Sequence, residues 1–355
     1  MRGQPLKTLF YFLITLLFLG SVLTTLIWYI LDTNHVEPRQ TPQKKRTPPA
    51  AVPCKGCREV VEKIMKGYSN TWKKQEDNYS KFRYELNLKC NGFNKAIITQ
   101  MNTPVGSKLV YDGEKKRTLK VTPEIFSTFT KDHPSSNKTW KTCAVVGNGG
   151  ILTNSSCGKR IDSAEFVMRC NLPPLQNGYE EHVGVKTNLV TANPSIMLDK
   201  YGGLMGRRRA FVEGLRTYGN SMLLLPAFSY GHNTPVSLRA LYTVEDFNSP
   251  IRPMFFNPEY LGNLARFWRS MGLKAARLST GIIMASFALE FCSEVNLYGF
   301  WPFSTHPHDF RALTNHYYDD RQTKVKFHAM PVEFSLLVKL HNEGVLRLHL
   351  GDCEP

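Results

Sequence analysis

The sequence predicts an α/β protein with one doubly wound, mostly parallel sheet, preceded by a membrane-spanning helix and a stem. From Cys143 to the carboxyl terminus, short apolar runs alternate with helical stretches, which is the order of elements in such a sheet. A glycine-rich turn follows the first run, as in Rossmann-like folds that bind phosphate. A long uncharged segment near the amino terminus adds the membrane helix.

Residues 9–31 predict a transmembrane signal anchor. These 23 residues carry no charge, and at about 1.5 Å per residue they span about 34 Å, enough to cross a bilayer. Arg2 and Lys7 precede the segment and Asp32 follows it. The positive-inside rule therefore leaves residues 1–8 as a cytosolic tail and places the rest in a lumen. The alternative is a cleaved signal peptide, whose apolar region is normally shorter.

Cysteines and sequons agree with a lumenal location. The chain has eight cysteines, which an oxidising compartment would use for disulfides. Asn-x-Ser/Thr glycosylation sequons stand at Asn78, Asn137 and Asn154. Residues 32–90 predict a lumenal linker and stem, because a stretch rich in Pro, Thr, Lys and Arg is followed by a helical pattern over residues 57–90. Residues 91–355 then form the main domain.

The strands of the sheet are expected at six apolar runs. These are residues 144–146, 166–168, 188–191, 222–225, 295–298 and 345–348. Helices are expected over residues 260–271, 282–292 and 331–342, and shorter strands before the sheet near residues 109–111 and 118–121. Because several of the runs end in polar residues and turns, a ligand crevice is expected at the carboxyl edge of the sheet.

Two function classes are disfavoured by the sequence. The net charge is +16, but the basic residues form short scattered clusters rather than a stripe with aromatic residues, so no nucleic-acid partner is expected. The turn Gly147-x-Gly149 has Leu152 where a dinucleotide fingerprint has its third glycine. No acidic residue closes the second strand, where Arg169-Cys170-Asn171 stands instead. A nucleotide-dependent oxidoreductase is therefore a less favoured alternative.

Two helix starts carry candidate ligand-binding groups. Ser279-Thr280-Gly281 precedes an apolar helix and leaves backbone N–H groups for a phosphate or a nucleotide carbonyl, simple N-capping being the alternative. His328 stands shortly before Pro331 and Glu333 at the start of another helix. The positive end of that helix dipole favours a neutral imidazole that can accept a proton. A histidine that only caps or packs is the alternative.

Together these motifs resemble the animal sialyltransferase family. Four stretches match the family's four motifs in order and spacing, namely residues 143–191, residues 277–301, His316 to Asp319, and His328 to Glu333. CAVVGNGGIL, RLSTG and HYYD are similar to the α2,8 branch, and most of all to its disialoganglioside-synthesising group. The resemblance implies a GT-A-like sialyltransferase variant of the fold. It also implies a single-pass type II Golgi membrane protein whose catalytic domain, residues 91–355, is lumenal.

The resemblance implies the reaction and its partners. The enzyme would transfer sialic acid from CMP-sialic acid, with inversion, to the 8-hydroxyl of a terminal sialic acid. A ganglioside is the first expectation for the acceptor and a sialylated glycoprotein the alternative. No cofactor and no metal are expected, and CMP-sialic acid is a co-substrate. A non-catalytic lumenal glycan-binding protein is a further alternative, and oligomerisation is left open.

The resemblance also implies the roles of individual residues. His328 is expected as the general base, and His316 as the group that contacts the donor phosphate and helps CMP to leave. The expected donor-binding residues are Asn148, Asn171, Ser279, Thr280, Gly281 and Trp301. Contacts with the donor or acceptor sugar are expected from Asn193, Pro194 and Ser195. The family's disulfides would be Cys143–Cys292 and Cys157–Cys353. Cys170 would remain a free thiol, whereas Cys54, Cys57 and Cys90 are not assigned.

Overall fold

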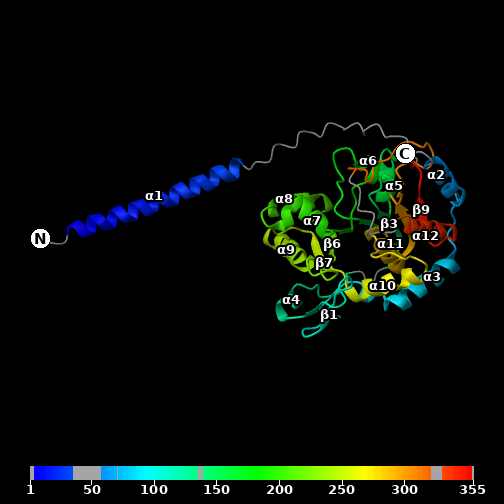
Figure 1. Ribbon diagram of the computed structural model, residues 1–355, viewed down its shortest axis with the longest axis horizontal. Helices are drawn as coiled ribbons and strands as arrows, with labels where there is room; N and C mark the ends of the chain where they lie inside the picture. Colours follow the sequence, from blue (N-terminus) through cyan, green and yellow to red (C-terminus); the bar gives the residue numbers. More distant parts are fainter. Residues whose placement is uncertain (1–3, 35–56, 70, 135–138, 321–329, 354–355) are drawn as a thin grey trace. The chain divides into compact units, whose positions relative to one another are not determined.

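The computed structural model describes residues 4–34, 57–69, 71–134, 139–320 and 330–353 (Figure 1). The chain divides into two compact units, Met1–Val52 and Pro53–Pro355. The described part of the first unit is one helix, α1 (Gln4–Asn34). Its stretch Leu9–Tyr29 has a mean hydropathy of 2.2 and is long and apolar enough to cross a membrane. This apolar helix fits the transmembrane anchor that the sequence predicts.

The second unit is built on a seven-stranded sheet whose neighbouring strands are all parallel. The strands are β3 (Trp140–Val146), β4 (Phe166–Arg169), β5 (Leu189–Thr191), β6 (Met222–Leu225), β7 (Arg252–Phe255), β8 (Cys292–Tyr298) and β9 (Arg347–His349). Their order is β7-β6-β5-β4-β3-β8-β9, so the direction of winding reverses between β3 and β8. The structure confirms the predicted doubly wound sheet and adds β7 to the predicted strands.

Helices cover both faces of the sheet because alternate residues of each strand point to opposite sides. Cys143 and Val145 of β3 belong to one core layer, Ala144 and Val146 to the other. The first layer includes α2 (Cys57–Lys66), α3 (Glu76–Cys90), α10 (Pro258–Ser270), α11 (Thr280–Phe291) and α12 (Met330–Asn342). The second includes α5 (Gly158–Asp162), α6 (Glu180–Val183), α7 (Pro194–Tyr201), α8 (Arg208–Leu215) and α9 (Asn233–Asp246).

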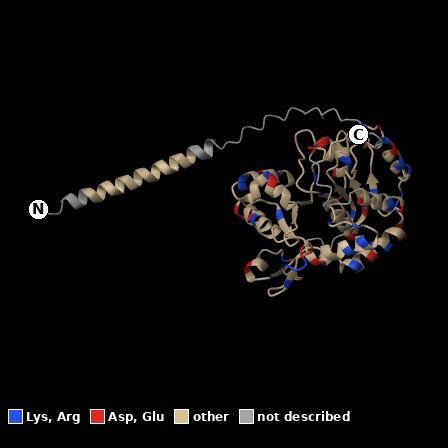
Figure 2. Cartoon of the chain, in the orientation of Figure 1, with Lys and Arg blue, Asp and Glu red and all other residues tan. Residues whose placement is uncertain are grey.

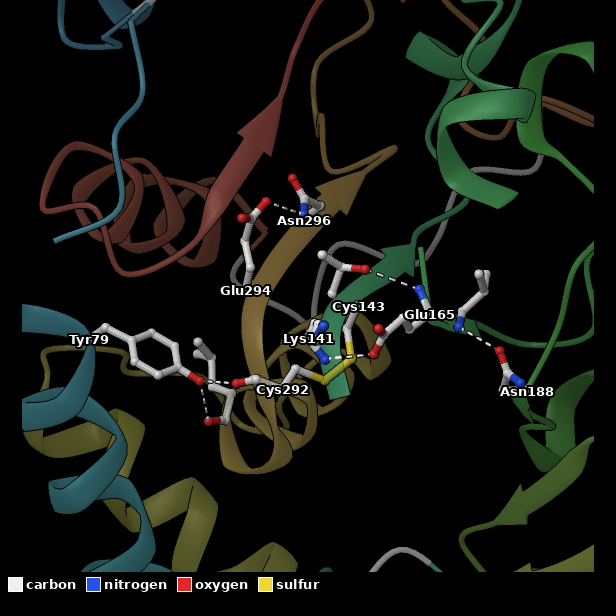
Figure 3. The surroundings of a disulfide bond; sticks show 11 residues. Tyr79, Lys141, Cys143, Glu165, Asn188, Cys292, Glu294 and Asn296 are labelled. Carbon is white, nitrogen blue, oxygen red and sulfur yellow. Dashed lines mark hydrogen bonds between the residues drawn. A yellow bond between two sulfur atoms is a disulfide. The ribbon is translucent and has the colours of Figure 1, made fainter. Parts of the chain in front are cut away.

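The predicted stem helices pack on the sheet domain. Tyr79, Phe82 and Leu86 of α3 are buried in the first core layer. The Tyr79 hydroxyl donates hydrogen bonds to the carbonyl oxygens of Cys292 and, at 3.3 Å, of Leu289 (Figure 3). Helix α3 is therefore hydrogen-bonded to the residues where α11 ends and β8 begins, and it belongs to the compact unit that begins at Pro53.

Both disulfides that the resemblance implies are present. Cys143–Cys292 joins β3 to the first residue of β8, with 6.0 Å between the Cα atoms (Figure 3). Cys157–Cys353 holds the carboxyl-terminal segment, where the Cys353 N–H also donates to the Ser155 carbonyl at 2.7 Å. Cys170 is a buried free thiol, as expected. Cys90 is free and buried as well.

A small antiparallel hairpin, β1 (Lys108–Val110) and β2 (Thr118–Lys120), lies outside the main sheet, and β1 contacts α10. The short helix α4 (Pro123–Ser127) follows it (Figure 1). Short 3-10 helices are η1 (Phe93–Lys95), η2 (Gly150–Leu152), η3 (Gly202–Leu204) and η4 (Arg216–Tyr218). Figure 2 shows basic and acidic residues interspersed over the second unit, in keeping with the scattered charge of the sequence.

Candidate active site

The glycine turn after β3 lies against two other segments at the carboxyl edge of the sheet. The Gly149 N–H donates to the Gly299 carbonyl oxygen after β8 at 3.0 Å. A Cβ atom on Gly150 would lie 2.1 Å from the carbonyl oxygen of Thr314. Glycine is needed there because any side chain would push the two backbones apart. The turn thus sits between the end of β8 and the loop that contains His316.

Asn148, in the middle of this turn, offers an unpaired amide oxygen. Its Nδ2 donates to the carbonyl of Cys170 at 2.8 Å, and its own carbonyl accepts from the Tyr317 N–H at 2.9 Å. Its Oδ1 is buried and has no hydrogen-bond partner within the described residues. An unsatisfied buried acceptor costs about 1–3 kcal/mol. This oxygen is therefore suited to accept a hydrogen bond from a bound ligand.

A chain of hydrogen bonds joins the ends of β4 and β5 to the start of α11. Asn171 has a left-handed backbone, with φ of 65°. Its N–H donates to the Thr191 hydroxyl and its Oδ1 accepts from the Asn193 N–H, each at 2.9 Å. The Asn193 amide in turn exchanges hydrogen bonds with the Thr280 hydroxyl, at 3.2 and 3.4 Å. Three residues that the sequence analysis singled out thus lie together.

Ser279 links this network to α12. Its hydroxyl accepts from the Ile282 N–H at 3.2 Å, so the N-capping role considered for it is present. Its own N–H donates to Oε1 of Glu333 at 2.9 Å, and Glu333 is only 3% exposed. Gly281 follows in the first turn of α11, where a Cβ atom would lie 2.8 Å from the Phe300 ring. The starts of α11 and α12 are therefore in direct contact.

His316 stands beside the glycine turn through a β-bridge with Gly149. Its Nδ1 lies 2.7 Å from Asp319 Oδ1, and its ring stacks on Tyr318 with 5.2 Å between the centroids and 9° between the planes. A carboxylate on one imidazole nitrogen fixes the orientation of the ring. The second nitrogen, Nε2, is 3.3 Å from the Asn315 amide.

The remaining expected site residues within the described part of the chain are not part of the hydrogen-bond network above. They are Trp301, Pro194 and Ser195. Trp301 is 5% exposed, its Nε1 donates to the Thr305 carbonyl at 2.8 Å, and its ring packs edge-on against Phe334. The side chain is therefore part of the core where β8 meets α12. Pro194 is buried in the first turn of α7, and Ser195 is exposed beside it.

His328 lies outside the described residues, two residues before the first residue of α12. The sequon asparagine Asn137 and Cys54 also fall outside them. Asn78 and Asn154 are exposed, and the Asn78 amide donates to the Glu343 carbonyl at 2.9 Å. The general-base and glycosylation assignments therefore stay predictions.

A cavity of about 600 Å³ adjoins Asn193 and Thr280. Its wall is formed by the β1–β2 hairpin, the segments that follow β6 and β7, and α10. Asp112 and Arg277 lie in its lining. Burial raises the pKa of the Asp112 carboxyl, although the Ser229 hydroxyl and the Arg277 charge counteract it. Sequence analysis did not find this cavity, because segments far apart in the chain contribute to it, among them the residues before and at the start of α11.

In the part of the chain that the structure describes, no group of three or more His, Cys, Asp or Glu side chains is placed to hold a metal ion. Asp319 contacts His316 through a direct hydrogen bond. The expectation of a metal-independent reaction stays a prediction.

Comparisons with known proteins identify relatives over most of the chain. The family model of glycosyltransferase family 29 (sialyltransferase) matches residues 97–345. Human "Alpha-2,8-sialyltransferase 8F" is 44% identical over 283 residues, which are 80% of this chain and 71% of that protein. "Alpha-N-acetylneuraminide alpha-2,8-sialyltransferase" of Xenopus tropicalis is 44% identical over 299 residues, 84% of this chain and 86% of that protein. A crystal structure of a mammalian sialyltransferase, 23% identical, covers 72% of this chain and 90% of its own with a TM-score of 0.50, and supports the fold.

Proposed function

The chain belongs to glycosyltransferase family 29, the sialyltransferases, and from this premise we propose that it transfers sialic acid from CMP-sialic acid to the 8-hydroxyl of a terminal sialic acid. Two relatives that are each 44% identical to this chain carry α2,8-sialyltransferase names, which supports this linkage. The acceptor that we propose is a ganglioside, in line with the motif wording that is most similar to the disialoganglioside-synthesising group.

The observation that carries the proposal is the contact between Glu333 and the Ser279 N–H. It joins the start of α12 to the network of Asn171, Asn193 and Thr280 at the carboxyl edge of the sheet. Ligands of doubly wound sheets bind at this edge. We therefore propose that the donor lies across Asn148, Asn171 and residues 279–281, and that the segment before α12 supplies the base to the same site.

In the proposed reaction His328 is the general base. The acceptor 8-hydroxyl oxygen attacks C2 of the donor sialic acid, and its proton passes to the His328 imidazole. The bond between C2 and the phosphate oxygen breaks, and CMP leaves with the bonding electron pair. Attack from the side opposite the phosphate inverts the configuration at C2. His316, held by Asp319 at 2.7 Å, is proposed to stabilise the charge on the departing phosphate.

The proposed topology follows the anchor. Residues 1–8 form a cytosolic tail, residues 9–31 the signal anchor, residues 32–90 the lumenal linker and stem, and residues 91–355 the catalytic domain. The apolar stretch Leu9–Tyr29 supports a single span, and the two disulfides suit an oxidising lumen. We propose the Golgi membrane as the location.

Transfer by the full-length protein in detergent tests this function. CMP-sialic acid is incubated with a monosialylated ganglioside, a sialylated glycoprotein and the desialylated form of each. The proposal expects product on the sialylated acceptors, with the ganglioside preferred, and an α2,8 linkage by methylation analysis and NMR. If the sialylated glycoprotein were preferred, the proposed ganglioside acceptor would be wrong and a glycoprotein would take its place. Transfer to the desialylated acceptors alone would contradict the proposed linkage.

A further inference from the structure

We propose that the cavity beside Thr280 is the acceptor site, and that Arg277 selects a sialylated acceptor by pairing with the carboxylate of its terminal sugar. The inference rests on the proposed function and adds to it a named determinant of acceptor choice. Arg277 is the first residue of the stretch 277–301 that resembles a family motif, but the roles assigned above include neither Arg277 nor the hairpin that faces it.

The cavity borders the proposed donor site. Asn193 and Thr280 line it, and the same two side chains hydrogen-bond with each other in the network that reaches Asn171. A sugar in this cavity would therefore lie next to residues 279–281. Its volume of about 600 Å³ falls in the range of small-ligand sites, about 300–1,000 Å³. Transfer requires the acceptor hydroxyl to be adjacent to the donor, and the cavity meets this requirement.

The charge of the lining favours an anion. Six basic and two acidic residues line the cavity. The basic residues are Lys95, Lys108, Lys115, Arg266, Arg269 and Arg277, and the acidic ones are Asp112 and Glu259. Five of the basic residues are exposed, whereas Arg277 is half-buried and precedes Thr280 by three residues. Only Arg277 therefore combines partial burial with a place beside the donor network.

Arg277 has an acidic and an aromatic neighbour in the cavity. Burial raises the pKa of the Asp112 carboxyl, and the Arg277 charge counteracts this rise, so the two groups are within electrostatic reach of each other. The Arg277 guanidinium lies 5.4 Å from the centroid of the Tyr230 ring. A guanidinium that stacks on an aromatic ring keeps its N–H fork in one plane and can bind a carboxylate through two hydrogen bonds. A lysine in the same place would supply the charge without the fork.

Asp112 provides the second half of the recognition. Its Oδ1 is buried and has no hydrogen-bond partner among the described residues. A sugar hydroxyl donates to such an oxygen, so a carboxylate on Arg277 and a hydroxyl on Asp112 are complementary to the two kinds of polar group on sialic acid. The pairing also explains how the cavity holds an acidic residue within a cationic lining.

The experiment compares acceptors with and without the carboxylate charge on the full-length protein. Acceptor KM, donor KM and kcat are measured for wild type, R277Q, R277K and D112N. R209Q is the matched control, because Arg209 is exposed on α8 and does not line the cavity. R277Q is expected to raise the acceptor KM by about 10- to 100-fold, the equivalent of a lost charged hydrogen bond. The donor KM of R277Q should equal that of wild type, and R209Q should have the acceptor KM of wild type. The acceptor KM of R277K should lie between those of wild type and R277Q.

A second measurement changes the acceptor instead of the protein. The sialic acid carboxylate of the acceptor is converted to its methyl ester, which removes the charge and keeps the hydroxyls. For wild type, the acceptor KM should rise on the methyl ester by the same factor by which R277Q raises it on the acid. For R277Q, the acid and the ester should have the same KM. Wild type that uses both equally, or R277Q that changes the donor KM instead, would overturn the inference. Wild type without sialyl transfer to any acceptor would instead contradict the proposed function.

Discussion

Glu333→Ala is expected to weaken both the fold and the donor site. Glu333 is 3% exposed, and its Oε1 accepts the Ser279 N–H at 2.9 Å. The substitution leaves a buried N–H without this acceptor. Hydrogen bonds to charged groups contribute about 1.5–3 kcal/mol, so the free energy of unfolding should fall by about 2–3 kcal/mol. For domains of about 150–250 residues, each kcal/mol lowers Tm by about 2–4 °C, which predicts a loss of about 4–12 °C.

Two variants calibrate this result. Glu333→Gln keeps an amide oxygen in the same place and should lose only the charged part of the interaction, about 1 kcal/mol. Glu343→Ala is the surface control, because the Glu343 carboxylate is 43% exposed and lies 3.8 Å from Lys339 in a surface ion pair. Such pairs contribute about 0–1 kcal/mol. The order of Tm should therefore be wild type, Glu343→Ala and Glu333→Gln close together, then Glu333→Ala.

The assay is thermal unfolding with the disulfides intact, repeated with saturating CMP. Because Ser279 begins the loop proposed to hold the donor, Glu333→Ala should also show a smaller CMP-induced rise in Tm than wild type. A Glu333→Ala protein with wild-type Tm and a wild-type response to CMP would refute the reasoning. The contact between α11 and α12 would then have no role in either stability or binding.

Three further predictions concern pH, covalent links and metal. Burial lowers the pKa of His349 to about 3 from the ordinary 6.5. Between pH 6.5 and pH 3, the imidazole is therefore protonated in the unfolded chain and neutral in the folded protein. Stability should be full above pH 6.5 and fall towards pH 3 by up to about 1.4 kcal/mol per pH unit, with a smaller slope in His349→Gln, as urea titrations would show. Replacing Cys157 and Cys353 by Ala removes a disulfide that spans 196 residues. The free energy of unfolding should fall by about 5 kcal/mol in the chain-entropy model, which lowers the urea midpoint. An unchanged midpoint would contradict this prediction. EDTA should leave the initial rate of transfer unchanged, and a rate restored only by added Mg²⁺ or Mn²⁺ would show that the metal-independent proposal is wrong.

Local patterns were enough to predict most of the sheet. Fully buried parallel strands are continuous apolar runs, and residues 144–146 and 222–225 have this form. Strand β7 was missed because it begins with Arg252-Pro253. It is the edge strand of the sheet, where the missing N–H of proline is tolerated. The helical pattern expected over residues 57–90 is formed by two helices, α2 and α3.

The site was predictable only in part, because its contacts join residues far apart in the chain. Asn193 and Thr280 are 87 residues apart, and Ser279 and Glu333 are 54 apart. The motif resemblance singled out most of these residues without showing which of them touch. Asp112 and Arg277 carried no motif signal that linked them, since only the fold brings the hairpin to the loop before α11. The role of Trp301 at the nucleotide stays a prediction, and its contact with Phe334 is one that no local pattern reveals.

The central claim is that His328 takes the proton of the acceptor hydroxyl at a site where the donor is bound by other residues. The most direct measurement is single-turnover transfer by His328→Ala at saturating CMP-sialic acid, together with the affinity of the same protein for CMP. The account predicts a rate lower by about 10²–10⁴-fold with CMP affinity close to wild type. A near-normal rate, or a rate loss that follows entirely from lost CMP binding, would contradict it.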